Sequence, residues 1–186
     1  MEFQRRKRTR LKDYDYSQNG VYFITICTKN RENIFLQNYK MENDTIHIEY
    51  TQLGEIAKKK ITYICEKYDV ILENFVVMPD HIHLLLGILN NEYRLTARVN
   101  PTISQIVGAY KSLISVEYLK YCKENNLYMG DIWQASFFDH IIRDDADYLI
   151  KYNYINENPL KWILKRSPEN ALEDEIMAIK KLMLIF

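Results

Sequence analysis

The chain has 186 residues, 47% of them hydrophobic, which is enough for one buried core and too few for a second domain of ordinary size. Lys plus Arg and Asp plus Glu both number 25, so net charge does not indicate a nucleic-acid partner. There is no apolar run long enough to span a membrane and no apolar leader after Met1, so we expect a soluble, cytoplasmic protein with no membrane partner.

The three cysteines, Cys27, Cys65 and Cys122, are odd in number and far apart in the chain. This spacing indicates neither a disulfide framework nor a cysteine zinc site. We expect each cysteine to be a small buried apolar residue.

Positive charge is concentrated at the beginning of the chain. Residues 1–16 form a basic arm, in which six cations precede Asp13 against the single acid Glu2. Such an arm could contact the phosphates of folded or single-stranded DNA, with Tyr14 and Tyr16 stacking on bases. The alternative is a solvated tail. The six cations are Arg5, Arg6, Lys7, Arg8, Arg10 and Lys12.

The first elements alternate between strand and helix patterns. The turn-forming pair Asn19-Gly20 precedes a β-rich run, VYFITICT, which predicts a central strand over residues 21–28. Residues 38–50 alternate weakly, which indicates a short hairpin or edge element with His47 exposed. From Thr51 apolar residues recur every three or four positions, which predicts an amphipathic helix ending near Tyr68.

Two strands follow, over residues 70–78 and 81–89, separated by Pro79-Asp80, because proline cannot donate to a central ladder. A long helical pattern covers residues 102–125, and residues 137–143 read as another strand. A last helix begins at Asp144 or Asp145, whose carboxylates suit a helix N-terminus. Pro159 should end or kink this helix.

This order of strands and helices predicts an α+β fold, a split β-α-β sandwich with helices packed on one face of a mainly antiparallel sheet. The other face of such a sheet is free for a site. We expect one domain over residues 17–166, followed by a helical appendage over residues 167–186.

The segment MPDHIHLLL contains two histidines, His81 and His83, separated by one apolar residue. On a strand this spacing points both imidazoles to the same face. Paired surface histidines or a satisfied core histidine is the ordinary interpretation. Polar rings in an otherwise apolar strand are costly to bury without partners, however, so a bound cation is an attractive alternative.

On the last helix, Tyr148, Tyr152 and Ile155 can face the core, while Tyr154 and Asn158 lie one turn apart on a different stripe. The chain contains 15 tyrosines, most of which must be packing residues with a hydrogen-bonded hydroxyl. By spacing alone, Tyr154 would be assigned to the core as well.

Three blocks together resemble the single-tyrosine HUH transposases of the IS200-like type, and within them the REP-associated tyrosine transposase branch. They are MPDHIHLLL, WQASFFDHIIRD from Trp133 and YINENP from Tyr154, and the resemblance covers residues 16–162. It implies a ferredoxin-like HUH endonuclease fold and a divalent metal held by His81 and His83. It also implies that Tyr154 is the nucleophile and Asn158 the third metal ligand. Imidazole, amide and phosphate or water ligands favour Mg²⁺ or Mn²⁺, although imidazole also tolerates zinc and other transition metals.

The resemblance further implies a reaction in which a tyrosine and a metal converge on one phosphate, giving a 5′-phosphotyrosine link and a free 3′-OH. The expected partner is single-stranded DNA with a hairpin, and the protein would be a monomer or a homodimer that exchanges the tyrosine helix. Insertion-sequence members commonly have glutamine where this chain has Asn158. The shorter amide before Pro159 matches the REP-associated branch and makes a domesticated, repeat-linked role plausible.

Three further residues are candidates for supporting roles. Lys151 could assist Tyr154 or hold the phosphate, or could simply be a solvated lysine. Asp80 could orient an imidazole through its second nitrogen. His140, beside Asp139, fits a structural or DNA-contacting residue better than a metal ligand.

Three functions remain open from the sequence. The first is a metal-dependent single-strand DNA endonuclease and strand transferase, that is, a transposase acting at hairpin-bearing ends. The second is a DNA-hairpin binding protein without catalytic activity. The third is a metal-dependent phosphoesterase in which His81 and His83 activate water and Tyr154 is only packed.

Overall fold

The computed structural model describes residues 18–42, 45–89 and 101–166, so the basic arm and the C-terminal appendage lie outside the described residues. The elements in chain order are β1 (Gly20–Cys27), η1 (Lys29–Arg31), β2 (Leu36–Glu42), β3 (Thr45–Tyr50), α1 (Gln52–Tyr68), β4 (Ile71–Val77), β5 (His81–Ile88), α2 (Ile103–Glu124), β6 (Phe138–Ile141) and α3 (Asp145–Arg166).

Four strands form one sheet in the order β4-β5-β1-β6, and every neighbouring pair is antiparallel. Leaving aside the β2–β3 hairpin, the chain runs β1-α1-β4-β5-α2-β6. This connectivity and strand order define the ferredoxin-like arrangement, which confirms the predicted α+β fold. The hairpin is inserted between β1 and α1, as the weakly alternating segment indicated, and His47 is exposed on it.

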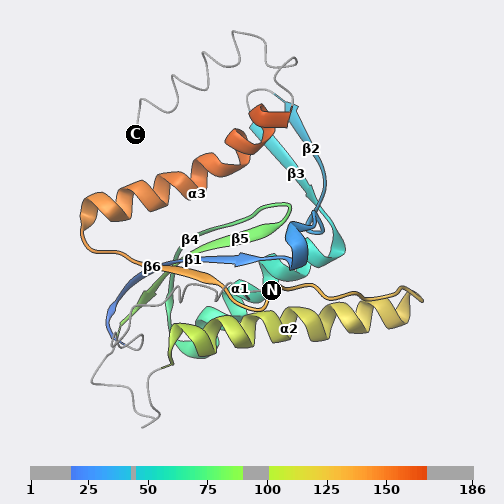
Figure 1. Cartoon of the computed structure of the whole chain (residues 1–186), viewed down its shortest axis with the longest axis horizontal. Helices are drawn as coiled ribbons and strands as arrows, with labels where there is room; N and C mark the ends of the chain where they lie inside the picture. The colour runs from blue at the N-terminus through green and yellow to red at the C-terminus, as the bar shows by residue number, and fades with distance from the viewer. Residues whose placement is uncertain (1–17, 43–44, 90–100, 167–186) are drawn as a thin grey trace, which may run out of the picture.

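The hydrophobic core lies between the sheet and the pair α1 and α2, which cover the same face (Figure 1). Alternate residues of β1 point into it, so Tyr22, Ile24 and Ile26 are fully buried. The hydroxyl of Tyr110 on α2 donates a buried hydrogen bond of 2.8 Å to the carbonyl of Ala57 on α1. The two helices are therefore joined by a polar contact as well as by apolar packing.

The third helix, α3, crosses the opposite face of the sheet (Figure 1). The expectation of helices on one face therefore describes α1 and α2, while α3 covers the face that the sequence left free for a site. It contacts β4 and β5, and its Tyr154 ring packs on His83. It also continues past Pro159 to Arg166, so Pro159 does not end the helix. The proline nitrogen cannot donate, and the helix therefore lacks one backbone hydrogen bond there.

Local sequence signals explain where the helices begin. The Thr51 hydroxyl caps α1 by accepting from the Gly54 amide, and Thr102 forms a capping box with Gln105 at the start of α2. Gly54 is required by close packing, since a Cβ atom there would lie 2.2 Å from the carbonyl oxygen of Phe35. The start of α1 is thus pressed directly against the segment that leads into β2.

All three cysteines are free and buried, as expected. None of the helices in the described part of the chain is long and apolar enough to cross a membrane.

Candidate functional site

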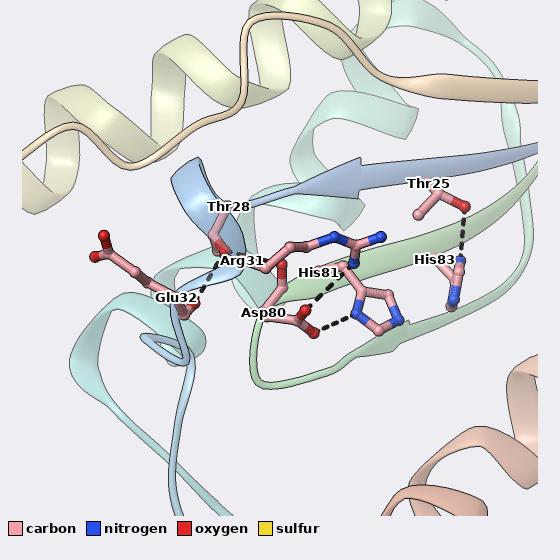
Figure 2. Close-up of polar contacts among 7 residues, drawn as sticks. All are labelled: Thr25, Thr28, Arg31, Glu32, Asp80, His81 and His83. Atoms are coloured by element: carbon pink, nitrogen blue, oxygen red, sulfur yellow. Dashed lines mark hydrogen bonds and ion pairs between the residues drawn. The ribbon is translucent and has the colours of Figure 1, made fainter.

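The turn between β4 and β5 is held firmly by the segment that follows β1. The Met78 amide donates to the carbonyl of His81 at 2.8 Å, which closes the turn over Pro79 and Asp80. The backbone amide and the hydroxyl of Thr28 both donate to the Asp80 carbonyl at 2.9 Å (Figure 2). Asp80 and His81 are therefore fixed at the edge of the site, next to η1.

His81 is oriented by the acid that precedes it. Its Nδ1 lies 2.5 Å from Oδ1 of Asp80, and the other carboxylate oxygen accepts from Nη1 of Arg31 at 3.3 Å (Figure 2). Burial alone would raise the pKa of Asp80. The hydrogen bond and electrostatic interaction with His81, together with the positive charge of Arg31, outweigh burial, so this pKa is lowered and the group is an ionised acceptor.

His83 is buried, with 4% of its surface exposed. Its Nδ1 is hydrogen-bonded to Oγ1 of Thr25 at 2.9 Å (Figure 2). Burial, with a smaller effect from the neighbouring His81, lowers the pKa of His83 to about 3, so the ring is neutral near pH 7. Its Nε2 is buried without a hydrogen-bond partner in the described structure.

The two imidazoles form a pair with their ring centroids 4.5 Å apart. Each ring is engaged through Nδ1, His81 with a carboxylate and His83 with a hydroxyl. An ionised carboxylate only accepts, so Asp80 favours the His81 tautomer that carries its proton on Nδ1 and leaves Nε2 free to bind a cation. The Thr25 hydroxyl, which can donate or accept, orients the His83 ring. The arrangement is the one that metal-ligating histidines adopt.

Tyr154 on α3 joins this pair within the same chain. Its ring centroid lies 5.2 Å from that of His83 and 5.9 Å from that of Phe23, which itself stacks on His83 at 5.0 Å. Tyr154 is nevertheless 41% exposed, so it is accessible to a large substrate. Lys151, nearly one turn earlier, places its Nζ 5.4 Å from the centroid of the Phe23 ring.

Asn158 lies one turn after Tyr154, as its spacing predicts. It is half-buried, and its Nδ2 is a buried atom without a hydrogen-bond partner in the described residues. A flip of the amide would place the oxygen where this nitrogen lies. The His83 imidazole on β5 and the Asn158 amide on α3 are thus two buried polar groups of the described residues whose chemistry suits a divalent cation. His, Cys, Asp and Glu side chains form no group of three suited to a metal among the described residues, so an amide would have to complete the set.

The helix that carries Tyr154 is held on β4 by side chains that the sequence did not single out. The Tyr148 hydroxyl contacts Oε2 of Glu73 at 3.0 Å, and burial with this carboxylate raises the pKa of Tyr148. Nδ2 of Asn74 donates to the Tyr152 carbonyl at 3.3 Å and to Oδ1 of Asn156 at 2.9 Å. Asn74 also lies where the pairing of β4 with β5 changes register, between Leu72 and Asn74.

His140 and Asp147 connect β6 to the first turn of α3. His140 Nε2 and Asp147 Oδ2 are 2.7 Å apart, and the same oxygen accepts from the Arg143 amide at 3.3 Å. The contact holds the two elements together, and the role of His140 stays a prediction.

Sequence reasoning missed four side chains that surround the candidate residues. Thr25 contacts His83, 58 positions later in the chain, and Arg31 contacts Asp80, 49 positions later. No local spacing in the sequence reveals such contacts. Glu73 and Asn74 do carry a signal, since two polar residues interrupt the strand ILENFVV. The six cations of the basic arm lie outside the described residues.

A ferredoxin-like sheet with two histidines on one strand, facing a tyrosine on a helix across that face, is the arrangement of an HUH single-tyrosine enzyme. The comparisons agree with this geometry. The family model described as "Transposase IS200 like" matches residues 16–158, and this chain therefore belongs to the IS200-like transposase family.

Relatives point to the REP-associated branch of that family. An uncharacterized Haemophilus influenzae protein is 32% identical, with coverage of 84% of this chain and 89% of the relative. A second Haemophilus influenzae protein, a candidate REP-associated tyrosine transposase, is 29% identical over 88% of this chain and 86% of its own length. In fold alone, the chain resembles a solved REP-associated tyrosine transposase bound to a REP hairpin, with a TM-score of 0.50, 19% identity and coverage of 81% of this chain and 74% of that one.

Proposed function

We propose that this chain is a metal-dependent single-strand DNA endonuclease and strand transferase that acts at hairpin-bearing DNA ends. The observation that carries the proposal is the position of Tyr154, whose ring lies 5.2 Å from that of His83 in the same chain while its side chain stays accessible. A phenol used only for packing has no need to face a pair of oriented imidazoles.

His81 and His83, through Nε2, and the amide oxygen of Asn158 would hold the cation. Two imidazoles, one amide oxygen and oxygens of water or phosphate favour Mg²⁺ or Mn²⁺, although imidazole also accepts other transition metals. When bound, such a cation neutralises charge on the nonbridging oxygens of a phosphodiester. Asp80 would keep His81 in the productive tautomer, and Thr25 would hold the His83 ring in its orientation.

Tyr154 would act as the nucleophile. Its hydroxyl oxygen attacks phosphorus, a new ester bond forms between them, and the bond from phosphorus to the 3′-oxygen breaks. The phenol loses its proton and the departing 3′-oxygen gains one, so the products are a 5′-phosphotyrosine and a free 3′-OH. One ester replaces another, so a second 3′-OH can reverse the step and join a new strand. Lys151, on the same helix, would contact the phosphate.

The partner and the assembly follow from the same site. A related solved protein was bound to a REP hairpin, which supports a hairpin-bearing strand as the substrate class. Within one chain the phenol already lies beside the imidazole pair, which supports a site that functions in a monomer without exchange of α3. The basic arm would add phosphate contacts outside this site.

Denaturing electrophoresis tests the proposal. The full chain is incubated with Mn²⁺ and a labelled single-stranded hairpin taken from the repeats that flank its gene. We expect a covalent protein–DNA adduct that is lost in Tyr154→Phe and kept in Tyr128→Phe, a matched control at a tyrosine that is 94% exposed. Binding without any adduct would favour a hairpin-binding protein. Hydrolysis that survives Tyr154→Phe would favour a phosphoesterase.

A further inference from the structure

We propose that Arg31 and the groove beside it bind the single-stranded part of the DNA, with the Arg31 guanidinium on a phosphate close to the one held at the histidine pair. This inference rests on the proposed function, since it names the path of the strand through that site. It is independent of the basic arm, which precedes all of the residues concerned.

The backbone around Arg31 is unusual. Asn30 and Arg31 both have left-handed conformations, with φ of 54° and 58°. Asparagine tolerates this region, but arginine rarely adopts it, and such strain persists where the surroundings enforce it. Here Thr28 enforces it, because its hydroxyl donates to the carbonyls of Glu32 and Asp80, each at 2.9 Å (Figure 2). The strained turn directs Arg31 toward the site.

The Arg31 guanidinium has N–H donors that remain available to a ligand. Its one hydrogen bond to a side chain in the described structure is the 3.3 Å contact with Asp80, and its side chain is 50% exposed. A guanidinium carries five N–H donors in a planar fork that matches phosphate geometry. Asp80 also holds His81, so this cation and the candidate metal ligand share one carboxylate (Figure 2).

A groove of about 740 Å³ opens from this position. It lies between η1 and the segment that precedes β6, and the side chains that line it include Lys29, Asn30, Arg31, Trp133, Gln134 and Ala135. The Trp133 indole is fixed, because its Nε1 donates to the Lys111 carbonyl at 3.2 Å and to the Ser115 hydroxyl at 3.0 Å.

The charge and chemistry of the groove fit a polyanion that carries flat rings. Two cations, Lys29 and Arg31, line it against the single carboxylate of Asp131, which pairs with Lys29. Amide side chains and an indole add surfaces for hydrogen bonds and stacking. Since Arg31 connects the groove to Asp80 and His81, a strand held at the histidines continues directly into it.

Binding of a fluorescein-labelled dT12 oligonucleotide to the full chain, measured by anisotropy at several salt concentrations, tests the proposal. We expect Arg31→Gln to weaken binding at least threefold and to reduce the slope of log K against log salt by about 0.7, the value for one phosphate contact on a single strand. Arg31→Lys should keep the slope. Arg143→Gln, at an exposed arginine near the opposite end of β1, is the matched control and should match the wild type.

A second pair of variants changes only exposed positions. Ala135 and Ser136 are neighbours and both exposed, but only Ala135 lines the groove. We expect Ala135→Glu to weaken dT12 binding at least fivefold and Ser136→Glu less than twofold.

Failure of this inference is distinguishable from failure of the proposed function. Wild-type affinity and slope in Arg31→Gln, or equal effects of the two glutamates, overturn the groove even if the wild type forms the Tyr154 adduct. If the salt slope of dT12 binding depends on Arg31 but no Tyr154 adduct forms, the DNA-binding groove is supported and the proposed nuclease activity is contradicted.

Discussion

The side-chain amide of Asn74 donates a hydrogen bond of 2.9 Å to Oδ1 of Asn156 and so connects β4 to the helix that carries Tyr154. Its second bond, to the Tyr152 carbonyl, places the two anchor points on either side of the candidate nucleophile. The position of Tyr154 over the histidines therefore depends on a residue of the sheet as well as on the packing of α3.

We expect Asn74→Ala to slow adduct formation by about tenfold or more, because a small displacement of a reacting group is costly in rate. Affinity for the hairpin should change less than twofold, since Asn74 is not proposed to touch DNA. Single-turnover adduct formation and anisotropy measure the two effects separately. The control is Asn125→Ala, which removes a similar amide contact with the Tyr121 carbonyl at the end of α2. Equal rates in the two variants would contradict the role given to Asn74.

Replacing each of the four histidines in turn should show which of them bind the metal. Binding of Mn²⁺ to the full chain, followed by electron paramagnetic resonance, should weaken at least tenfold in His81→Gln and in His83→Gln. His47→Gln and His140→Gln should retain it, since His47 is exposed on the hairpin and His140 is paired with Asp147.

The contact between Asp80 and His81 can be tested in the same experiment, because its loss should reduce metal affinity only in part. Loss of a partner that orients a ligating imidazole typically costs about 10-fold to 100-fold in metal affinity, so Asp80→Asn should fall in that range. Unchanged Mn²⁺ affinity in Asp80→Asn would mean that the carboxylate does not orient a ligand.

Acid should weaken the junction between β6 and α3. The hydrogen bond from His140 holds the pKa of Asp147 below its ordinary value of 3.8. A lowered folded pKa contributes stability above the ordinary value, and this contribution is lost as the pH falls through the folded pKa. Asp147→Asn should therefore lose less stability than the wild type between pH 6 and pH 3, measured as the urea midpoint. Asp145→Asn, at an exposed acid in the same turn, should behave like the wild type.

Two glycines in helices should respond in opposite directions to the same substitution. Gly54→Ala drives a Cβ atom to within 2.2 Å of the Phe35 carbonyl oxygen, and overpacking of this kind costs about 1 to 3 kcal/mol. Gly108→Ala meets no atom within 4 Å on the exposed side of α2 and should stabilise the protein by about 0.5 to 1 kcal/mol. Thermal or urea unfolding measures both, and a neutral Gly54→Ala would show that α1 can move away from Phe35.

Most element boundaries could be predicted because their signals are local. Thr51 and Thr102 cap the two core helices at the positions where the apolar period of the sequence begins. Pro79-Asp80 separates two strands because proline cannot donate to the ladder. The end of α3 could not be predicted in this way. Pro159 suggested an end or a kink, but α3 continues to Arg166, and its Trp162 ring lies 5.4 Å from that of Tyr39 on the hairpin. The contact with the hairpin joins residues that are far apart in the chain.

The sequence by itself determined that His81 and His83 share one face of a strand and that Tyr154 and Asn158 share one side of a helix, because the periods of strand and helix fix these relations. Only the tertiary structure decided that α3 crosses the histidine face of the sheet in the same chain. It also decided that Thr25, Arg31 and Asn74 surround the site. Those contacts join strands, turns and a helix that are distant in sequence, and their energies depend on burial and distance, which no local pattern contains.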